Sequence, residues 1–460
     1  MNTLGTYLKN IRTQRGCSLK DVYDHCGLTD SRLSRAERGE ENLNLSELKK
    51  LSSFYNVNFL EILMQSGYLL NSDFENHYFV FKNTELLTTE EKTIIQEQIN
   101  TLTKDRRQLL GEFKLGELFC GPGGLAWGAI HADIGVPGFK ILHEWSNDYD
   151  ENTCKTYIRN ICPDAPETVI CEDVKELDIS KLTPIDAFAF GFPCNDFSVV
   201  GEQKGISGNY GPLYTYGIKV LEYFKPKWFL AENVGGLRNA NEGNAFSIIL
   251  KAMRDAGYNL YPNLYKFETY GIPQARHRII IVGIRNDLDL KFKIPSNKPY
   301  ANCDNTCKNA IENPPIADDV PNNEKTLQKS SVVERLKYIK PGQNAFTADL
   351  PEELQLHIKG AKISQIYKRL DPNKPSYTVT GSGGGGTHIY HWDEPRALTN
   401  RERARLQTFP DDFIFIGNKE SVRKQIGMAV PCLGAKIIFE AILKTFAKVP
   451  YESMEPNITE

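Results

Sequence analysis

From residue 113 onward, strand-like apolar segments alternate with helical segments, and this alternation constrains the fold more than any other feature of the chain. Strands separated by helices usually run parallel in one sheet, with the helices packed on its faces. We therefore expect a mostly parallel α/β sheet. The strand-like segments are 113–119, 140–144, 185–190, 227–231 and 278–284, and the helical segments include 214–224, 245–256, 398–408 and 434–446.

Changes in composition predict the domain organisation. Residues 286–395 interrupt the strand–helix rhythm with many Asn, Pro, Asp and Lys residues and a glycine run at 381–386. A charged helix is predicted at 88–110. We predict a helical unit at 1–66, a helical linker at 67–112, the sheet domain at 113–285, an inserted loop-rich lobe at 286–395, a return to the sheet domain at 396–450 and a tail at 451–460.

The first 66 residues contain a helix, a glycine-containing turn and a second helix. Ser18 is placed to cap the first helix, and the second begins at Thr29 and ends at Gly39, with Leu33 facing inward. The second helix carries Arg32, Arg35 and Arg38. The segment resembles the Xre/Cro-type helix-turn-helix domain of phage-repressor-like regulators, which implies operator DNA as a partner of residues 29–38. A generic helical bundle is the alternative.

Two reactive side chains follow strand-like runs. In GFPCNDFS, Cys194 follows an apolar run, and in AENVGG, Glu232 ends the run WFLA. Ligand sites of parallel sheets lie beyond the carboxyl ends of the strands. A thiolate and a protonatable carboxyl on one rim suggest nucleophilic attack assisted by proton donation. The alternatives are a packed thiol and an acid at a helix N-terminus.

The segment ELFCGPGGLAWG places a glycine loop between the first strand and a helix. Its glycines permit a tight turn and close approach of a ligand to the backbone. The next strand is expected to end at Glu144, whose carboxylate could accept hydrogen bonds from both ribose hydroxyls. Phe119 and Trp145 offer faces for adenine, and Asp173 could meet its amino edge. The loop glycines are Gly121, Gly123 and Gly124. The spacing to Ala126 also fits a dinucleotide fingerprint, so an NAD oxidoreductase is an alternative.

The segment QARHRIIIVG adds two guanidiniums. Because side chains alternate along a strand, Gln274, Arg276 and Arg278 are expected to share one face. Two guanidiniums at the rim could hold an anion, a carbonyl or a carboxylate. Exposed strand arginines are the alternative, which the central apolar run IIIV weakens.

These blocks and their order along the chain resemble those of the DNA (cytosine-5)-methyltransferase family. RALTNRERARLQTFPDDF and QIGMAVPCLGAKII extend the resemblance, which covers residues 113–450. It implies a Rossmann-like methyltransferase sheet with an inserted target-recognition lobe that reads base edges in the major groove. It implies S-adenosylmethionine as cofactor and double-stranded DNA as substrate, with the cytosine flipped out of the duplex.

The resemblance also implies residue roles. Cys194 would attack carbon 6 of cytosine, Glu232 would neutralise ring nitrogen 3, Arg278 would hold the exocyclic oxygen, and Arg276 would help to order the pocket. The cofactor residues would be Phe119, Gly121, Gly123, Gly124, Glu144, Trp145, Asp173 and Pro193. Pro122, Asn195 and Met428 depart from the family pattern, and Met428 stands where the family has a cofactor-site Asn.

Composition limits the remaining functions. The 460 residues carry a net charge of −3 and no apolar run that predicts a membrane span or a signal peptide. Ten scattered cysteines indicate reduced thiols in a cytoplasm. Cys303 and Cys307 lack a second ligand pair, so no metal is expected. The leading interpretation is a methyltransferase of a restriction-modification system, which could regulate its own promoter. The rival is a DNA-binding regulator with an inactive methyltransferase half.

Overall fold

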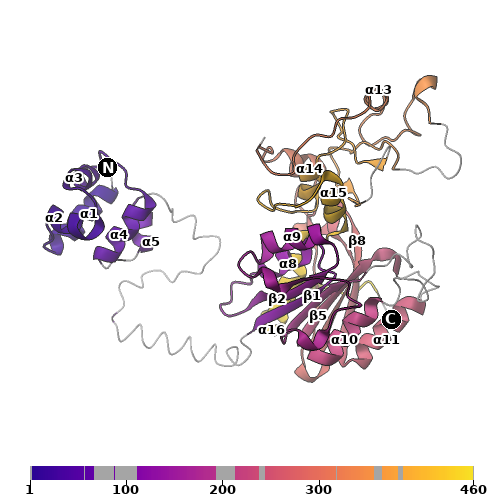
Figure 1. Cartoon of the computed structure of the whole chain (residues 1–460), viewed down its shortest axis with the longest axis horizontal. Coiled ribbons are helices and arrows are strands. Elements are labelled where there is room, and N and C mark those ends of the chain that lie inside the picture. The colour runs from indigo at the N-terminus through magenta and orange to yellow at the C-terminus, as the bar shows by residue number, and fades with distance from the viewer. Residues whose placement is uncertain are drawn as a thin grey trace. The chain divides into compact units, whose positions relative to one another are not determined.

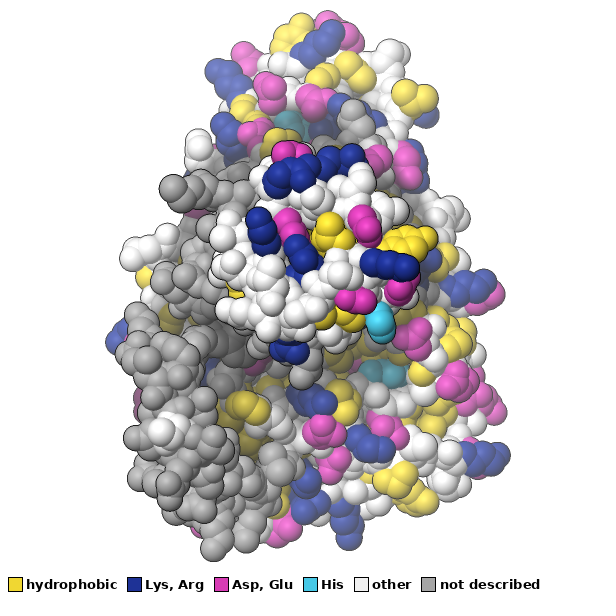
Figure 2. Space-filling view, turned by 90° about the vertical axis from the view of Figure 1, so that its left-hand side faces the viewer, with side chains coloured by type: hydrophobic (Ala, Val, Ile, Leu, Met, Phe, Trp, Pro, Cys, Tyr) yellow, Lys and Arg dark blue, Asp and Glu magenta, His cyan; other side chains and the backbone are white. Residues whose placement is uncertain are grey.

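The computed structural model describes residues 3–55, 57, 59–66, 88, 111–192, 213–237, 244–317, 319–356, 365–381 and 387–458. The chain forms two compact units, Met1–Leu102 and Thr103–Glu460, whose elements are drawn in Figure 1. The helix predicted at 88–110 lies, apart from Thr88, outside the described residues. Figure 2 shows cationic and anionic side chains interspersed over the face that it presents.

The first unit packs short helices around one apolar core. They are α1 (Thr3–Gln14), α2 (Leu19–Cys26), α3 (Asp30–Arg38), α4 (Leu45–Tyr55) and α5 (Phe59–Gln65). Ser18 and Thr29 cap α2 and α3 through their side chains, and α3 ends at Gly39, whose φ is 77°. Leu33 is fully buried in the core of this unit. The helix–turn–helix prediction is confirmed.

The second unit is built on a seven-stranded sheet with the order β3–β2–β1–β4–β5–β8–β6. The strands are β1 (Glu112–Leu118), β2 (Lys140–Asp148), β3 (Val169–Cys171), β4 (Ala187–Gly191), β5 (Trp228–Val234), β6 (Tyr258–Lys266) and β8 (His277–Arg285). The first five of these pair in parallel, whereas β8 is antiparallel to both β5 and β6. The α/β prediction is confirmed, although β3 and β6 had not been identified.

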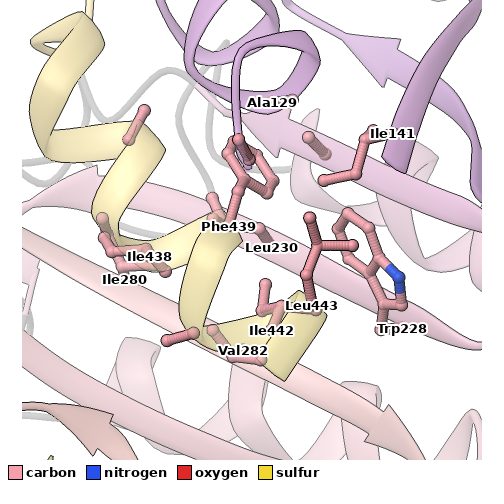
Figure 3. Close-up of a cluster of buried hydrophobic side chains, with 14 of the residues drawn as sticks. Ala129, Ile141, Trp228, Leu230, Ile280, Val282, Ile438, Phe439, Ile442 and Leu443 are labelled. Atoms are coloured by element: carbon pink, nitrogen blue, oxygen red, sulfur yellow. The ribbon is translucent and has the colours of Figure 1, made fainter. Parts of the chain in front are cut away.

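Alternating side chains give the sheet two buried faces. In β5, Trp228 and Leu230 enter one core, and Phe229 and Ala231 enter the other. Figure 3 shows the first core, in which α16 residues such as Phe439 pack on the sheet. On this face lie α8 and α16, and on the other lie α10 and α11. Their bounds are α8 (Gly124–Ile130), α10 (Tyr214–Phe224), α11 (Asn244–Asp255) and α16 (Cys432–Phe446).

A smaller lobe interrupts the sheet domain. It contains α12 (Cys307–Glu312), α13 (Ser330–Tyr338), β10 (Ser376–Tyr377), α14 (Asn400–Leu406) and α15 (Lys419–Met428). Side chains of α12, α14 and α15 share one apolar core. The return to the sheet predicted from residue 396 therefore begins later in the structure, at α16.

The segment predicted to be a tail is packed against the sheet domain. β11 (Ser453–Met454) pairs with β9 (Ile294–Pro295), and Ile458 is buried in the second sheet core. Asn457 hydrogen-bonds the backbone of Leu264 on the edge strand β6. Residues 453–458 of the predicted tail therefore pack as part of the sheet domain.

Among the described residues, one stretch, Lys419–Phe446, has the length and apolar character of a membrane span. It comprises α15 and α16, and 72% of its most apolar window is buried inside the protein. It is therefore accounted for as core.

Candidate active site

A cavity of about 840 Å³ lies at the carboxyl ends of the parallel strands. Its wall is formed by the residues that follow β1, β2, β3 and β4, by the ends of β5 and β8, and by α15. The strand order reverses between β1 and β4, which is where open α/β sheets bind ligands. Its volume falls within the usual range for small-molecule sites.

The glycine loop forms the floor of the cavity. Phe119, Gly121 and Gly124 line it, and both Phe119 and Gly121 have positive φ angles, of 56° and 57°. A Cβ on Gly124 would lie 2.4 Å from the Val430 carbonyl, so glycine permits the α15–α16 connection to close over the loop. Gly123 does not line the cavity; it is the N-cap residue of α8, and a Cβ there would lie 2.9 Å from Ile161 Cγ1.

The acid that ends the second strand is Asp148, four residues after the predicted Glu144. β2 continues to Asp148, so the prediction that this strand ends at Glu144 is wrong. Glu144 forms an ion pair with Lys114 at 3.2 Å, and Trp145 is buried and donates to the Thr183 carbonyl at 3.0 Å. Neither side chain lines the cavity. Pairing with β1 and β3 extends the strand beyond the predicted end.

Asp148 and Tyr149 occupy the rim position that had been assigned to Glu144 and Trp145. The Asp148 carboxylate accepts hydrogen bonds from the backbone N–H groups of Gly121, at 3.1 Å, and Asp150, at 3.0 Å. Burial raises the pKa of Asp148. Tyr149 lines the cavity and is 69% exposed, so its ring is available to a ligand. The helix cap at Asp150 was the available sequence signal, because a strand normally continues to the turn before the next helix.

The buried side-chain amide of Asn147 orients the part of the cavity wall that carries Glu172 and Asp173, here named the acidic wall. Asn147 donates from Nδ2 to the Ile170 and Glu172 carbonyls, at 3.0 and 2.9 Å. These bonds fix the end of β3, from which Glu172 and Asp173 reach the cavity. Asp173 therefore lines the cavity together with Asp148, and its contact with an adenine amino group stays a prediction.

Glu232 and Arg278 form an ion pair inside the cavity. Arg278 Nε lies 2.7 Å from Glu232 Oε1, and both side chains are largely buried. Glu232 sits opposite Gly191 of β4, and a Cβ at Gly191 would approach Glu232 Oε2 to 3.2 Å. The glycine leaves room for the carboxylate, and the guanidinium fixes its orientation.

Arg276 connects the sheet to the smaller lobe. Its guanidinium is buried and donates to the carbonyls of Val379, Gly427 and Met428, at 3.0 to 3.3 Å. Burial lowers its pKa. Arg276 lines the cavity, but these three bonds make it a positioning residue rather than an anion-binding one.

The expectation that Gln274, Arg276 and Arg278 share one strand face is wrong. Gln274 belongs to a separate strand, β7 (Gln274–Ala275), which pairs with β10 of the lobe. Its amide donates to Gln407 Oε1 at 2.9 Å and accepts from the Val379 N–H. The chain leaves the sheet between β8 and β7, so the alternation does not extend to Gln274.

The described chain is anchored at Phe192, two residues before Cys194. Asn233 is buried and donates to the Phe192 carbonyl at 3.1 Å, which ties the end of β4 to β5. The sequence analysis missed this residue, although it is part of the block AENVGG. Pro193, Cys194 and Asn195 lie outside the described residues, so their roles stay predictions.

Two side chains of α15 complete the wall. Lys424 and Met428, one turn apart, line the cavity, and Lys424 Nζ lies 5.8 Å from the centre of the Tyr149 ring. Met428 is 47% exposed. The predicted contribution of the last sequence block to this site therefore includes Met428, Ala429 and Val430.

Comparison with known proteins identifies the family. The model of C-5 cytosine-specific DNA methylases matches residues 113–444. The chain belongs to this family. The methylase is 59% identical over 355 residues to the Type II methyltransferase M.BbvI of Brevibacillus brevis, covering 75% of this chain and 94% of that protein. It is 38% identical to M.NgoFVII of Neisseria gonorrhoeae, covering 73% and 87%.

The remaining comparisons agree with the two-unit organisation. A helix-turn-helix model matches residues 8–62 of the methylase. Its fold resembles a prophage-encoded E. coli protein assigned as a DNA modification methyltransferase, with a TM-score of 0.55, 22% identity and coverage of 73% and 99%. The methylase is a DNA (cytosine-5-)-methyltransferase, so the NAD oxidoreductase alternative is wrong.

Proposed function

We propose that the methylase transfers a methyl group from S-adenosylmethionine to carbon 5 of a cytosine flipped out of duplex DNA. The observation that carries this proposal is the convergence of the Glu232–Arg278 pair and the Asp148 rim on one cavity. Because relatives such as M.BbvI are Type II methyltransferases, we further propose a cytoplasmic restriction-modification system as its setting.

The residues on the sheet rim fit the proposed cofactor. Gly121, where an added Cβ would meet nothing within 4 Å, would let its amino-acid part approach the backbone, and Asp148 would accept the ribose hydroxyls. Tyr149 offers a face for adenine, and Asp173 an acceptor for its amino group. When bound, S-adenosylmethionine supplies an electrophilic methyl group on a sulfonium.

The other half of the cavity suits a cytosine ring. The Cys194 thiolate would add to carbon 6, which raises the nucleophilicity of carbon 5. Glu232 would donate a proton or a hydrogen bond to ring nitrogen 3, and Arg278 would donate to the exocyclic oxygen. After methyl transfer, loss of the proton from carbon 5 would release Cys194. A base inside a duplex exposes neither face, so this chemistry requires flipping.

The first test is methyl transfer from tritiated S-adenosylmethionine to duplex DNA by the full chain. Cys194→Ala is expected to abolish transfer, and Glu232→Gln to lower kcat by roughly 10²–10⁴-fold, the usual contribution of general acid catalysis. Both variants should retain cofactor binding, because neither side chain is assigned to the cofactor.

Two outcomes would contradict the mechanism. Turnover by Cys194→Ala would exclude a covalent step at this thiol. Absence of transfer by the unaltered chain on DNA of mixed sequence, together with no cofactor binding, would favour the rival, a DNA-binding regulator with an inactive methyltransferase half. If the unaltered chain is active, bisulfite sequencing of DNA from cells that express it identifies the target site.

We also propose that the N-terminal unit binds operator DNA through residues 29–38. The family match at residues 8–62 and the capped α2–α3 pair support this. The arginines of α3 are paired within the unit: Arg32 with Glu47 at 2.7 Å, Arg35 with Glu41 at 2.8 Å and Arg38 with Glu40 at 2.8 Å. DNA phosphates would have to replace these carboxylates, so binding should depend strongly on salt.

A further inference from the structure

Two free thiols lie behind the acidic wall of the cavity. Cys154 is in the first turn of α9 (Glu151–Ile161), six residues after the rim residue Asp148, and is 2% exposed. Cys171 is the last residue of β3, directly before Glu172 and Asp173, and is exposed. Neither thiol has a place in the proposed reaction.

Backbone contacts place both cysteines next to Asp148. Asp148 is the register partner of Cys171 across the β2–β3 pair, and its carbonyl accepts a hydrogen bond from Cys154 Sγ at 3.4 Å. Val169, which lies two residues before Cys171 and therefore on the same face of β3, packs with Cys154 in one buried cluster. The pair therefore bridges the first turn of α9 and the end of β3.

We propose that Cys154 and Cys171 form a peroxide-sensitive pair, and that their disulfide weakens binding of S-adenosylmethionine. The second part rests on the proposed function of the cavity. The first part stands on the thiol geometry alone.

The oxidation balances with one molecule of a peroxide. The accessible Cys171 sulfur attacks the peroxide, breaks its O–O bond and becomes a sulfenic acid, and one water leaves. Cys154 sulfur then displaces the hydroxyl, which departs as a second water after taking the Cys154 proton. Burial raises the pKa of Cys154, so Cys171 reacts first and the second step accelerates with pH.

The disulfide would disturb the cofactor wall in two ways. Cys154 would lose its hydrogen bond to the Asp148 carbonyl. The disulfide would hold the two sulfurs about 2.05 Å apart, which draws the end of β3 toward α9. Asp173 lies two residues after β3, and Asp148 ends β2 three residues before α9 begins, so their separation should change.

The experiment uses the full chain with Cys194→Ser, which removes the catalytic thiol as a competing target. The protein is treated with hydrogen peroxide, cross-linked peptides are mapped by mass spectrometry, and the Kd for S-adenosylmethionine is measured before and after dithiothreitol. Cys171→Ser is the test variant. Cys303→Ser, which removes another exposed thiol, is the matched control.

We expect a peptide linked through Cys154 and Cys171 and a Kd at least five-fold higher, reversed by dithiothreitol. Both effects should be lost in Cys171→Ser and kept in Cys303→Ser. Absence of the linked peptide, or an unchanged Kd in the linked protein, would overturn the proposal. Failure of the reduced protein to bind S-adenosylmethionine would instead count against the proposed function, since the linked peptide is scored independently.

Discussion

At the scale of residues, the clearest difference between the sequence prediction and the structure is which carboxylate of β2 lines the cavity. Glu144 and Asp148 lie in the same strand, but only Asp148 reaches the cavity. Glu144 is engaged by Lys114, whereas Asp148 is bonded to the glycine loop through Gly121. Substitution of Asp148 should therefore weaken cofactor binding, whereas substitution of Glu144 should not.

Replacing Asp148 by Asn should raise the Kd for S-adenosylmethionine by about ten-fold or more, because a charged hydrogen-bond acceptor for the ribose is lost. The amide oxygen can still accept from Gly121, but the amide nitrogen cannot accept from the Asp150 N–H, so circular dichroism must show that the fold is kept. Glu144→Gln is the matched control and should leave the Kd unchanged. Isothermal titration of both variants measures this. An equal loss in Glu144→Gln would restore the original assignment.

At the scale of elements, β1 carries a buried acid beneath the active site. Glu117 accepts from the Tyr157 hydroxyl at 3.1 Å, and this hydroxyl also contacts His143 Nδ1 at 3.2 Å. Burial raises the pKa of Glu117 to about 8 from an ordinary 4.5. A carboxyl that is neutral in the folded state couples stability to pH.

The sign follows from the raised pKa. The stabilisation is complete below pH 4.5, the ordinary value, and is lost as the pH rises toward 8, because the unfolded chain releases its proton first. Glu117→Gln should therefore have a higher Tm than the unaltered chain at pH 8, with a gap that narrows at pH 5. Glu112→Gln, exposed on the same strand, is the control. Thermal unfolding at both pH values tests this, and a pH-independent gap would contradict it.

Within the lobe, the contact between α15 and the segment at Gly381 is equally specific to the tertiary structure. A Cβ on Gly427 would lie 1.9 Å from the backbone nitrogen of Gly381, and the Gly427 carbonyl accepts from Arg276. Backbone atoms cannot yield as a flexible side chain can.

Gly427→Ala should therefore lower Tm by several degrees and reduce methyl transfer, since α15 would be pushed from the cavity. Gly236→Ala is the control, because nothing lies within 4 Å of its added Cβ. Calorimetry and the transfer assay measure both variants. Tolerance of Gly427→Ala equal to that of Gly236→Ala would show that the junction is not closely packed.

At the scale of the whole molecule, two compact units serve one chain. The first has its own apolar core, and the family match of the second begins at residue 113. Residues 1–66 contain nine Lys and Arg and eight Asp and Glu residues, so the net charge of this segment is close to zero and gives it no general attraction to DNA.

Deleting residues 1–66 should leave the rate of DNA methylation within about two-fold and abolish binding to a fragment of the methylase's own promoter. The reason is that the cavity residues all belong to the second unit. Gel-shift and methyl-transfer assays on the same preparation test this, with Glu232→Gln as a binding-competent, low-activity control. Equal promoter binding by the truncated chain would contradict the operator proposal.

The sequence by itself determined the parts that depend on local periodicity and capping. The alternation of strands and helices, the caps at Ser18 and Thr29 and the apolar alternation around Trp228 are properties of short segments. The cavity positions of Glu232 and Arg278 followed as well, because both lie at the ends of strongly apolar strands.

Tertiary structure alone decided which of several plausible polar residues faces the cavity. β2 extends to Asp148 because β1 and β3 pair with it, and no local pattern contains those partners. Arg276 is directed to carbonyls of distant segments, and the final residues reach the sheet core through Ile458. Such contacts join positions far apart in the chain, so they stabilise the protein only once the whole sheet domain has folded.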